Sequence, residues 1–326
     1  MTQLFAPGTQ DSSFDDDRTS ALPAVRGTGP RKSRSQAQRF NTRGGKAFDV
    51  VNVVFLAAVG VLALAPFLFV LARSFASETE LETRPFFFWP DHFDLGAYSA
   101  IFTTPSFTRA VVTTVLVTAV GTVIQLLMTV TMAYPLAKKD LPGRNFILSA
   151  VLVTLVFGGG MIPTFLIVKE LGLLNTYWAL ILPLAINPFS LIIIKNFFQN
   201  LPAELEESAK VDGATEVQVL MRIVLPLSKP ILATFALFYA VGIWNDFMSP
   251  LLYLNDSSMW TLQMFLQQVT AATDLTTAQQ SDPSYIPPSQ GIKYAVIVVA
   301  TIPVLIFYPF LQKHFAKGML IGAVKG

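Results

Sequence analysis

The sequence predicts an all-α integral membrane protein with six transmembrane helices, and three observations support this fold class. Apolar residues make up 52% of the 326 side chains. Charged residues make up only 13%, whereas about a quarter of the residues in a soluble domain are charged. Uncharged stretches of about 20 residues recur along the chain, and a helix of this length crosses a bilayer core. Strands of a membrane barrel would instead alternate apolar and polar residues.

Six stretches are long and apolar enough to span a membrane as helices, because a helix pairs its own backbone groups within lipid. Only the fifth stretch contains a charged residue, Asp246. Lys169 and Glu170 alone separate the third stretch from the fourth, and the glycines at 158–160 can loosen the third helix. The predicted spans are Val50–Ala72, Ala110–Ala137, Asn145–Val168, Leu171–Ile194, Pro230–Asn255 and Tyr294–Gln312.

Residues 1–46 contain no apolar run and are predicted to form a disordered cytoplasmic tail. The segment begins acidic, with Asp11 and its neighbours, and becomes basic towards Lys46. A segment of this composition cannot bury enough apolar surface to fold by itself. Residues 47–326 are therefore predicted to form a six-helix transmembrane domain.

The distribution of Lys and Arg predicts that both termini are cytoplasmic. With this orientation, most of the 23 Lys and Arg residues lie in the tail, in the inner loops 138–144 and 195–229, or after residue 312. Cytoplasmic segments of membrane proteins carry an excess of these residues. Two long loops, 73–109 and 256–292, then face outward, and the second is suited either to an extracytoplasmic partner or to a solvated connection.

The inner loop between the fourth and fifth spans, residues 200–226, is the least lipid-like of the inner loops. Pro202 suits the first turn of a helix, and the carboxylates that follow it favour the positive end of the helix dipole. Glu206 and Lys210 stand four residues apart and are expected to form an ion pair on the helix surface. Gly213 can adopt the left-handed conformation that ends a helix and redirects the chain.

A second short helix is predicted after this turn, and Pro226 is expected to begin the helix that follows it. Apolar residues recur at helical spacing and form a narrow stripe that can pack against the membrane domain: Val217, Leu220, Met221 and Val224. The result is a stiff, charged helix pair that projects from the membrane domain. Such a pair is suited to docking in a groove of another protein.

The 200–226 loop contains Glu207-Ser208-Ala209, Gly213, Ile223 and Leu225-Pro226 at a distinctive spacing. This pattern resembles the EAA loop of ATP-binding cassette (ABC) importer permeases. The family pattern is E-A-A, three residues, G, nine residues, I, one residue and L-P, and the chain agrees with this spacing at every fixed position. The only departure is Ser208, which stands where Ala is usual. By resemblance, Glu207 contacts a partner ATPase and Gly213 sets the helix angle. The residues that carry the likeness are Glu207, Ser208, Ala209, Asp212, Gly213, Ala214, Ile223, Leu225 and Pro226.

Three further segments resemble permeases that take up carbohydrates. FWPDHFDLGAYSAIF, residues 88–102, is similar to the segment before their second span, and WNDFMSPLLYL, residues 244–254, is similar to their fifth. The stretch that begins at Phe157 resembles the maltose-permease relatives, which import oligosaccharides. This likeness implies a type I ABC importer permease in the bacterial plasma membrane, with an oligosaccharide as solute.

The resemblance also implies the binding partners and cofactors of the complete transporter. The expected partners are a second, similar permease subunit, an ATPase dimer, an extracytoplasmic solute-binding protein and membrane lipid, but no nucleic acid. Gly44, Gly45 and Lys46 do not fit the phosphate-binding pattern G-x-x-x-x-G-K-[ST]. ATP and Mg²⁺ are therefore expected on the partner ATPase, and no cofactor on this chain.

No catalytic or metal site is expected in this chain. The sequence contains no cysteine, which excludes a thiolate nucleophile and a cysteine-based metal site. Its two histidines, His92 and His314, are predicted to lie on opposite sides of the membrane. A membrane enzyme would need a nucleophile and a base, or a cluster of metal ligands, at one site.

Polar residues within the fifth predicted span are candidates for the solute pathway. Tyr239, Trp244, Asn245 and Asp246 cluster there, and an intramembrane carboxylate is costly enough to indicate a pathway or a structural partner. Tyr239 and Asp246 are seven residues apart, so a continuous helix would place both on one face. Packing and hydrogen bonding between helices would account for the same residues.

Two alternative functions are compatible with parts of this pattern. An ABC importer for another solute, such as an amino acid, a peptide or phosphate, would share the EAA loop. A stand-alone secondary transporter would be driven by an ion gradient, and such proteins usually carry ionisable relays or inverted repeats. Here only Asp246 interrupts a span, and no repeat is evident in the sequence.

Overall fold

The computed structural model describes residues 43–274 and 289–323, and every regular element within these ranges is a helix. Residues 1–42 of the predicted tail lie outside them. The chain divides into two compact units, Met1–Ala58 and Val59–Gly326. In the first unit the described residues form the beginning of helix α1 (Arg43–Ser74), where the side chains of residues 48–58 are exposed.

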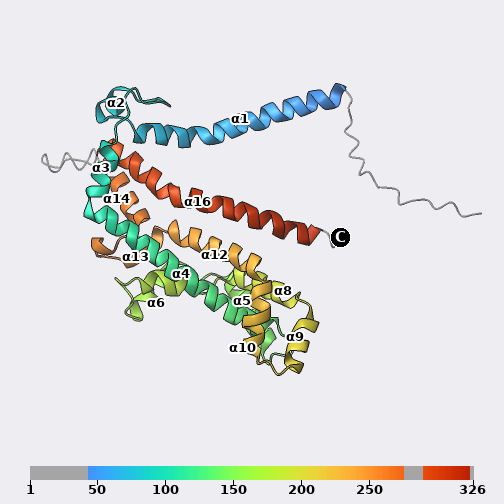
Figure 1. The fold of residues 1–326 in the computed structure, drawn as a ribbon. Helices are drawn as coiled ribbons and strands as arrows, with labels where there is room; N and C mark the ends of the chain where they lie inside the picture. The colour runs from blue at the N-terminus through green and yellow to red at the C-terminus, as the bar shows by residue number, and fades with distance from the viewer. Residues whose placement is uncertain (1–42, 275–288, 324–326) are drawn as a thin grey trace, which may run out of the picture. The chain divides into compact units, whose positions relative to one another are not determined.

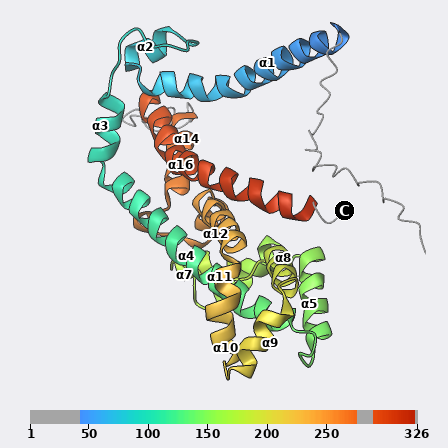
Figure 2. The ribbon, with the colours of Figure 1, turned by 45° about the vertical axis from the view of Figure 1, so that its right-hand side comes forward.

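Helix α4 (Pro105–Ala137) is the central element of the second unit. It packs along α12 and α8, as Figures 1 and 2 show from two directions, and it also contacts α3, α7 and α14. Gly121 permits the close approach of α4 to α12, because a Cβ atom there would lie 2.8 Å from Cδ1 of Ile243. These helices are α3 (Gly96–Thr103), α7 (Trp178–Ile181), α8 (Pro188–Gln199), α12 (Lys229–Trp244) and α14 (Leu262–Asp274).

The predicted third and fourth spans are each broken. Helices α5 (Arg144–Val156) and α6 (Met161–Glu170) meet at an angle of 118°, and Gly160 between them has a φ of +80°. Helix α7 and the short 3₁₀ helix η1 (Leu182–Leu184) meet α8 at 51°. Asn187 accepts a hydrogen bond from the backbone N–H of Ser190 at 3.0 Å, so a new helix begins at this break.

The prediction of six spans is not confirmed by the described residues. Two helices alone, within α1 and α4, are long and apolar enough to cross a membrane, and the number rises to five if each bent pair counts as one span. The predicted fifth span is interrupted after Trp244, where α12 ends, and the chain continues in α13 (Met248–Tyr253). The predicted sixth span lies within α16 (Gln290–Ala323).

The remaining elements are short. Helix α2 (Glu78–Thr83) follows α1, and η3 (Ser257–Met259) lies between α13 and α14. The 200–226 loop and its continuation contain four consecutive pieces: α9 (Ala203–Val211), α10 (Glu216–Val219), the π-helical turn η2 (Leu220–Val224) and α11 (Leu225–Leu227).

A buried arginine joins the end of α1 to α16. Arg73 is only 4% exposed and lies over the rings of Phe69 and Tyr294, with its guanidinium carbon 5.2 and 4.9 Å from the two ring centroids. It donates hydrogen bonds to the carbonyl oxygen of Pro85 at 2.8 Å and to the side-chain oxygen of Gln290 at 3.3 Å. The arginine therefore fixes the packing of these segments within the second unit.

Candidate functional site

Helix α9 carries the acidic part of the 200–226 loop. Pro202 occupies the position immediately before the helix, where the lack of a backbone N–H costs nothing. Glu204 and Glu206 follow in the first turn, where negative charge is favoured by the helix dipole. The acidic first turn agrees with the prediction, but Pro202 lies immediately before the helix and not in its first turn.

Gly213 makes the turn between α9 and α10. Its φ of +83° is the left-handed conformation that the sequence predicts. The backbone N–H of Ala214 donates to the carbonyl of Ala209 at 2.9 Å, and the N–H of Gly213 donates to that of Lys210 at 3.0 Å, which is the Schellman pattern. Thr215 then begins α10 with a capping box, so two opposed helix ends meet within a few residues.

The ion pairs of the loop differ from the predicted pair of Glu206 and Lys210. Glu206 is bound instead by Lys138, at the end of α4, and Lys210 is bound by Glu216 of α10 at 2.5 Å. The prediction was wrong because it considered α9 alone, whereas the folded chain offers each residue a partner on another helix. The 200–226 loop is thereby joined to the membrane domain.

Tyr134 of α4 makes a second connection to the loop. Its hydroxyl donates a hydrogen bond to Oε2 of Glu216 at 2.7 Å, and its ring lies 4.7 Å below the ammonium group of Lys138. The hydrogen bonds from Lys210 and Tyr134 lower the pKa of the Glu216 carboxyl, and Glu216 in turn raises the pKa of Lys210. Both groups are therefore charged at neutral pH.

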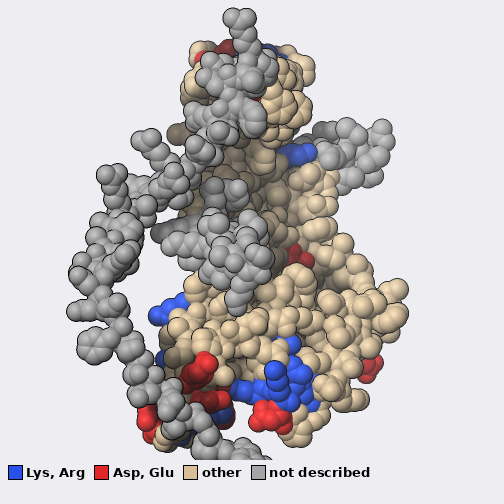
Figure 3. All heavy atoms as spheres, turned by 90° about the vertical axis from the view of Figure 1, so that its right-hand side faces the viewer, with Lys and Arg blue, Asp and Glu red and all other residues tan. Residues whose placement is uncertain are grey.

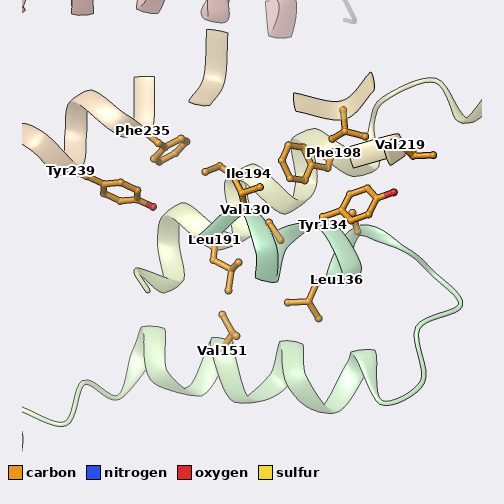
Figure 4. Close-up of a cluster of buried hydrophobic side chains, with 13 residues drawn as sticks. Val130, Tyr134, Leu136, Val151, Leu191, Ile194, Phe198, Val219, Phe235 and Tyr239 are labelled. Atoms are coloured by element: carbon orange, nitrogen blue, oxygen red, sulfur yellow. The ribbon is translucent and has the colours of Figure 1, made fainter. Parts of the chain in front are cut away.

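The inward face of the loop is apolar and anchored. Ala209, Ala214, Ile223 and Leu225 pack against a hydrophobic cluster formed by α4, α5, α8 and α12 with Val219 and Val224. Figure 4 shows Tyr134 of α4 in this cluster with Phe198 and Val219.

The outward face of the loop carries the predicted contact residues. Glu207, Ser208, Asp212, Gly213 and Pro226 are all exposed. The carboxylate of Glu207 makes no hydrogen bond or ion pair with the residues that the structure describes. In Figure 3 charged side chains gather at the lower end, where α9 and α10 lie in Figures 1 and 2.

A shallow hollow of about 410 Å³ opens at the turn on this exposed part of the loop. Asp212, Gln218 and Arg222 supply its polar groups, and Gly213 and Ile223 lie beside them. The hollow lies at the turn, so a side chain from another protein could be seated there.

The predicted apolar stripe of the second short helix is partly wrong. Val224 is fully buried as expected, but Val217 and Met221 are 69% and 59% exposed, and Val219 is buried in their place. The π-helical turn η2 changes the register, because it contains more residues per turn than the α-helix on which the prediction relied. Pro226 lies in the first turn of the short helix α11, and α12 starts only after Ser228.

The four candidate pathway residues occupy two different environments. Tyr239 and Trp244 are buried, with 6% and 7% of their surfaces exposed. The hydroxyl of Tyr239 is 3.0 Å from that of Thr129 on α4, and the indole N–H of Trp244 donates to the carbonyl of Ala300 on α16 at 3.1 Å. Both side chains therefore join α12 to neighbouring helices.

Asn245 and Asp246 lie at the break after α12. Asn245 is exposed and donates a side-chain hydrogen bond to the carbonyl of Val241 at 2.8 Å. Oδ1 of Asp246 accepts from the backbone N–H of Ser249 at 3.1 Å at the beginning of α13. The expectation that Tyr239 and Asp246 share one helix face is wrong, because α12 ends at Trp244.

No group of three or more His, Asp or Glu side chains within residues 43–274 and 289–323 could hold a metal ion. The chemistry available at the loop is therefore that of a charged and hydrogen-bonding surface on an apolar base.

Residues 35–321 match the family described as "Binding-protein-dependent transport system inner membrane component". The chain belongs to this family. It is thus a multi-pass inner membrane component of a transport system, and its role is that of a transport subunit.

Two relatives from Bacillus subtilis match this permease over nearly their whole length. Protein LplC is 61% identical over 287 residues, which cover 88% of this chain and 97% of LplC. The polygalacturonan/rhamnogalacturonan transport system permease protein YtcP is 49% identical over 286 residues, which cover 86% of this chain and 99% of YtcP.

A solved structure has the same fold as this permease. It is the crystal structure of a bacterial ABC transporter involved in the import of the acidic polysaccharide alginate, and its matching chain has a TM-score of 0.77 at 32% identity. The match covers 85% of this chain and 99% of that one. The permease architecture predicted from the sequence is therefore confirmed at the level of the fold.

The contacts between α4 and the loop of this permease were not predicted. Lys138 and Glu206 are 68 residues apart in the sequence, and Tyr134 and Glu216 are 82 apart. One signal was present in the sequence: Lys138 immediately follows an otherwise apolar span and precedes the inner loop. That signal gives a location for Lys138 but no partner.

Proposed function

We propose that this permease is the transmembrane subunit of an ATP-driven ABC importer that passes an oligosaccharide into the cytoplasm by alternating access. The observation that carries the proposal is the two-sided 200–226 loop. Its inward face is packed on the membrane domain, while Glu207 and Asp212 are exposed and Asp212 lines the hollow at the turn. A surface of this kind can receive force from a partner and pass it to the helices below.

The partner in this proposal is a dimeric ATPase that binds ATP and Mg²⁺ itself. Glu207, Ser208 and Asp212 contact the ATPase, and Gly213 sets the angle between α9 and α10. A second permease subunit completes the membrane pore, and an extracytoplasmic binding protein delivers the solute. In this arrangement the bent helix pairs and α16 complete six spans, and both termini lie in the cytoplasm.

Support for an oligosaccharide comes from the names of the relatives. YtcP is named for polygalacturonan and rhamnogalacturonan, and the neighbouring structure for alginate. The arabinooligosaccharides transport system permease protein AraQ of Halalkalibacterium halodurans is 32% identical over 83% of this chain and 94% of AraQ. Each of these names describes a polymer or oligomer of sugars.

The break after α12 is the proposed contact of this subunit with the solute pathway. Irregular backbone at membrane depth is tolerated where it is covered by protein or lines a water-filled cavity. Asn245 and Asp246 lie at such a break and carry groups that can hydrogen-bond a sugar hydroxyl. Tyr239 and Trp244 fix the helix that leads to it.

Reconstitution tests the proposed function. The permease is placed in liposomes alone and then with its companion permease, ATPase and binding protein, and uptake of radiolabelled oligosaccharides is measured with and without ATP. We expect uptake only from the complete system with ATP. Uptake by the permease alone, driven by an ion gradient, would contradict the proposal and support a secondary transporter.

A pair of charge reversals tests the role of the loop. Glu207→Lys reverses a charge on the proposed contact face, and Glu204→Lys makes the same change one turn earlier on the same helix. We expect Glu207→Lys to abolish uptake and Glu204→Lys to retain most of it, with equal amounts of both proteins in the membrane. Equal uptake by the two variants would show that Glu207 has no special part in docking.

A further inference from the structure

We propose that Lys138 and Tyr134, at the end of α4, are positioning residues that transmit movement of the 200–226 loop to the membrane helices. This inference rests on the proposed function, because it concerns how force from a docked ATPase reaches the spans. The set of contacts made by Lys138, Tyr134, Glu206, Glu216 and Lys210 is called the α4–loop linkage below.

The geometry of the α4–loop linkage is a closed triangle of contacts. Lys138 binds Glu206, which joins α4 to α9. Tyr134 donates to Glu216 at 2.7 Å, which joins α4 to α10. Lys210 binds Glu216 at 2.5 Å, which joins α9 to α10 across the turn at Gly213. Each helix of the loop is thus tied both to α4 and to the other helix.

The three contacts are needed to hold α9 and α10 together because the turn between them, at Gly213, is not closely packed. A Cβ atom on Gly213 would meet no heavy atom within 4 Å, so the turn is open on the side of this glycine. Without the α4–loop linkage, α9 would be held by its connections to α8 and α10 and by the packing of Leu201 and Ala209. With it, α9 and α10 move as one body with the end of α4.

The Lys138–Glu206 pair is the better shielded of the two ion pairs. Its side chains are 24% and 18% exposed, whereas those of Lys210 and Glu216 are 45% and 55% exposed. Exposed ion pairs are screened by water and salt and contribute little. The ammonium group of Lys138 also lies over the Tyr134 ring, which adds a cation–π contact at the same point. The Lys138–Glu206 pair is therefore expected to persist during movement of the loop better than an exposed ion pair would.

The position of α4 makes its end a useful point of attachment. Helix α4 packs against α12 and α8, and the hydrophobic cluster below the loop contains side chains from all three helices. A displacement of the end of α4 therefore moves the centre of the second unit. The loop is also anchored by the apolar packing of residues such as Ala209 and Ile223. This packing resists separation of the loop from the membrane domain, but it is non-directional and does not fix their relative orientation.

A charge-swap experiment tests the linkage in the reconstituted complex. Lys138→Glu places two carboxylates against each other, Glu206→Lys does the same with two ammonium groups, and the double variant restores an ion pair in reverse. Lys139→Glu is the matched control, because Lys139 is the neighbouring residue, is exposed and makes no ion pair with the described residues. The measured quantity is the amount of solute imported per ATP hydrolysed.

We expect each single reversal to lower the solute imported per ATP by about ten-fold, while the ATPase still co-purifies with the permease. The double variant should recover to within about two-fold of the wild type, and Lys139→Glu should match the wild type. A purely structural role would lower the amount of assembled complex but would leave the ratio unchanged.

A milder variant covers the case in which the reversals fail to assemble. Tyr134→Phe keeps the ring beneath Lys138 and removes only the hydrogen bond to Glu216, and it should lower the ratio by about two-fold. Wild-type ratios in Lys138→Glu and Tyr134→Phe, or a double variant no better than the single ones, would overturn the linkage. If the complete wild-type complex imported nothing with ATP, the proposed function itself would fail, and the linkage with it.

Discussion

The 200–226 loop and the end of α12 both carry polar residues that were singled out from the sequence, but the structure uses them differently. On the loop, Glu207 and Asp212 are exposed, and Glu207 has no polar partner among the described residues. On α12, the polar atoms of Tyr239 and Trp244 are buried and already bonded to α4 and α16. The carboxylate of Glu207 is therefore available to another protein, whereas the polar atoms of Tyr239 and Trp244 are used within the fold.

The two sets of polar side chains also differ in what it costs to leave them without a hydrogen-bond partner. The buried hydroxyl and indole groups on α12 would be costly to leave unpaired, so their partners lie within the chain. An exposed carboxylate such as that of Glu207 is solvated by water and costs little to leave without a partner. A change of the exposed Glu207 should therefore affect transport without affecting stability, and changes of the buried Tyr239 or Trp244 should do the reverse.

The largest expected effect is that of Gly213→Asp. An aspartate at a φ of +83° is strained relative to glycine, although less than most residues are, and it adds a negative charge next to Asp212 at the turn. Both effects should alter the angle between α9 and α10. We expect uptake by the reconstituted complex to fall to the background of empty liposomes, with normal amounts of protein in the membrane. Transport assays and immunoblots of membranes measure the two quantities.

Gly172→Asp provides the control for this change. Gly172 ends α6 with a φ of +66°, an open surrounding and the same pair of backbone hydrogen bonds as Gly213. The backbone cost is therefore matched, but the site is remote from the loop in the sequence. Uptake by Gly172→Asp should remain close to that of the wild type. Equal loss in both variants would mean that the damage is general and not specific to the loop.

The next largest effect is a loss of stability in Trp244→Ala. Removal of this buried indole, which also donates to the carbonyl of Ala300, should cost about 3–5 kcal/mol. Asn245→Ala, at the next position, removes an exposed amide and should change stability by less than about 0.5 kcal/mol. Thermal unfolding in detergent measures both. A stable Trp244→Ala protein with altered solute specificity would instead make Trp244 a pathway residue.

The smallest effect is expected for Tyr239→Phe, which removes one hydroxyl from the contact of α12 with α4. The hydrogen bond to Thr129 should contribute about 0.5–1 kcal/mol. A double-mutant cycle with Thr129→Val isolates this term, because the second change should cost less once the first has been made. Additive effects of the two changes would show that the hydroxyls do not interact.

Features that depend on a few neighbouring residues were predictable from the sequence. Gly213 ends a helix because of its own conformational freedom, and the structure places it in that conformation. Asn187 and Pro188 also form a recognisable helix start, which the prediction of a continuous fourth span overlooked. An apolar composition alone does not distinguish a continuous helix from two helices that meet at an angle.

Features that depend on residues distant in the sequence were not predictable. The partner of Glu206 is Lys138 and not Lys210, because α4 and α9 meet only in the folded chain. One local feature was also missed: Val217 is exposed and Val219 buried because of the π-helical turn that follows, for which the apolar pattern gave no signal. Similarly, the resemblance located the loop in the sequence but did not indicate how it is attached to the membrane domain.

Site-specific cross-linking tests the central claim most directly, namely that the outward face of α9 docks on a partner ATPase. The chain contains no cysteine, so Glu207→Cys and the control Glu170→Cys, an exposed residue at the end of α6, each introduce a single reactive thiol. A short thiol cross-linker is applied to the complete complex. We expect Glu207→Cys to form a covalent product with the ATPase and Glu170→Cys to form none. The claim would be contradicted if Glu207→Cys formed a covalent product with the extracytoplasmic binding protein. It would also be contradicted if Glu207→Cys formed no product with the ATPase in a complex that transports solute.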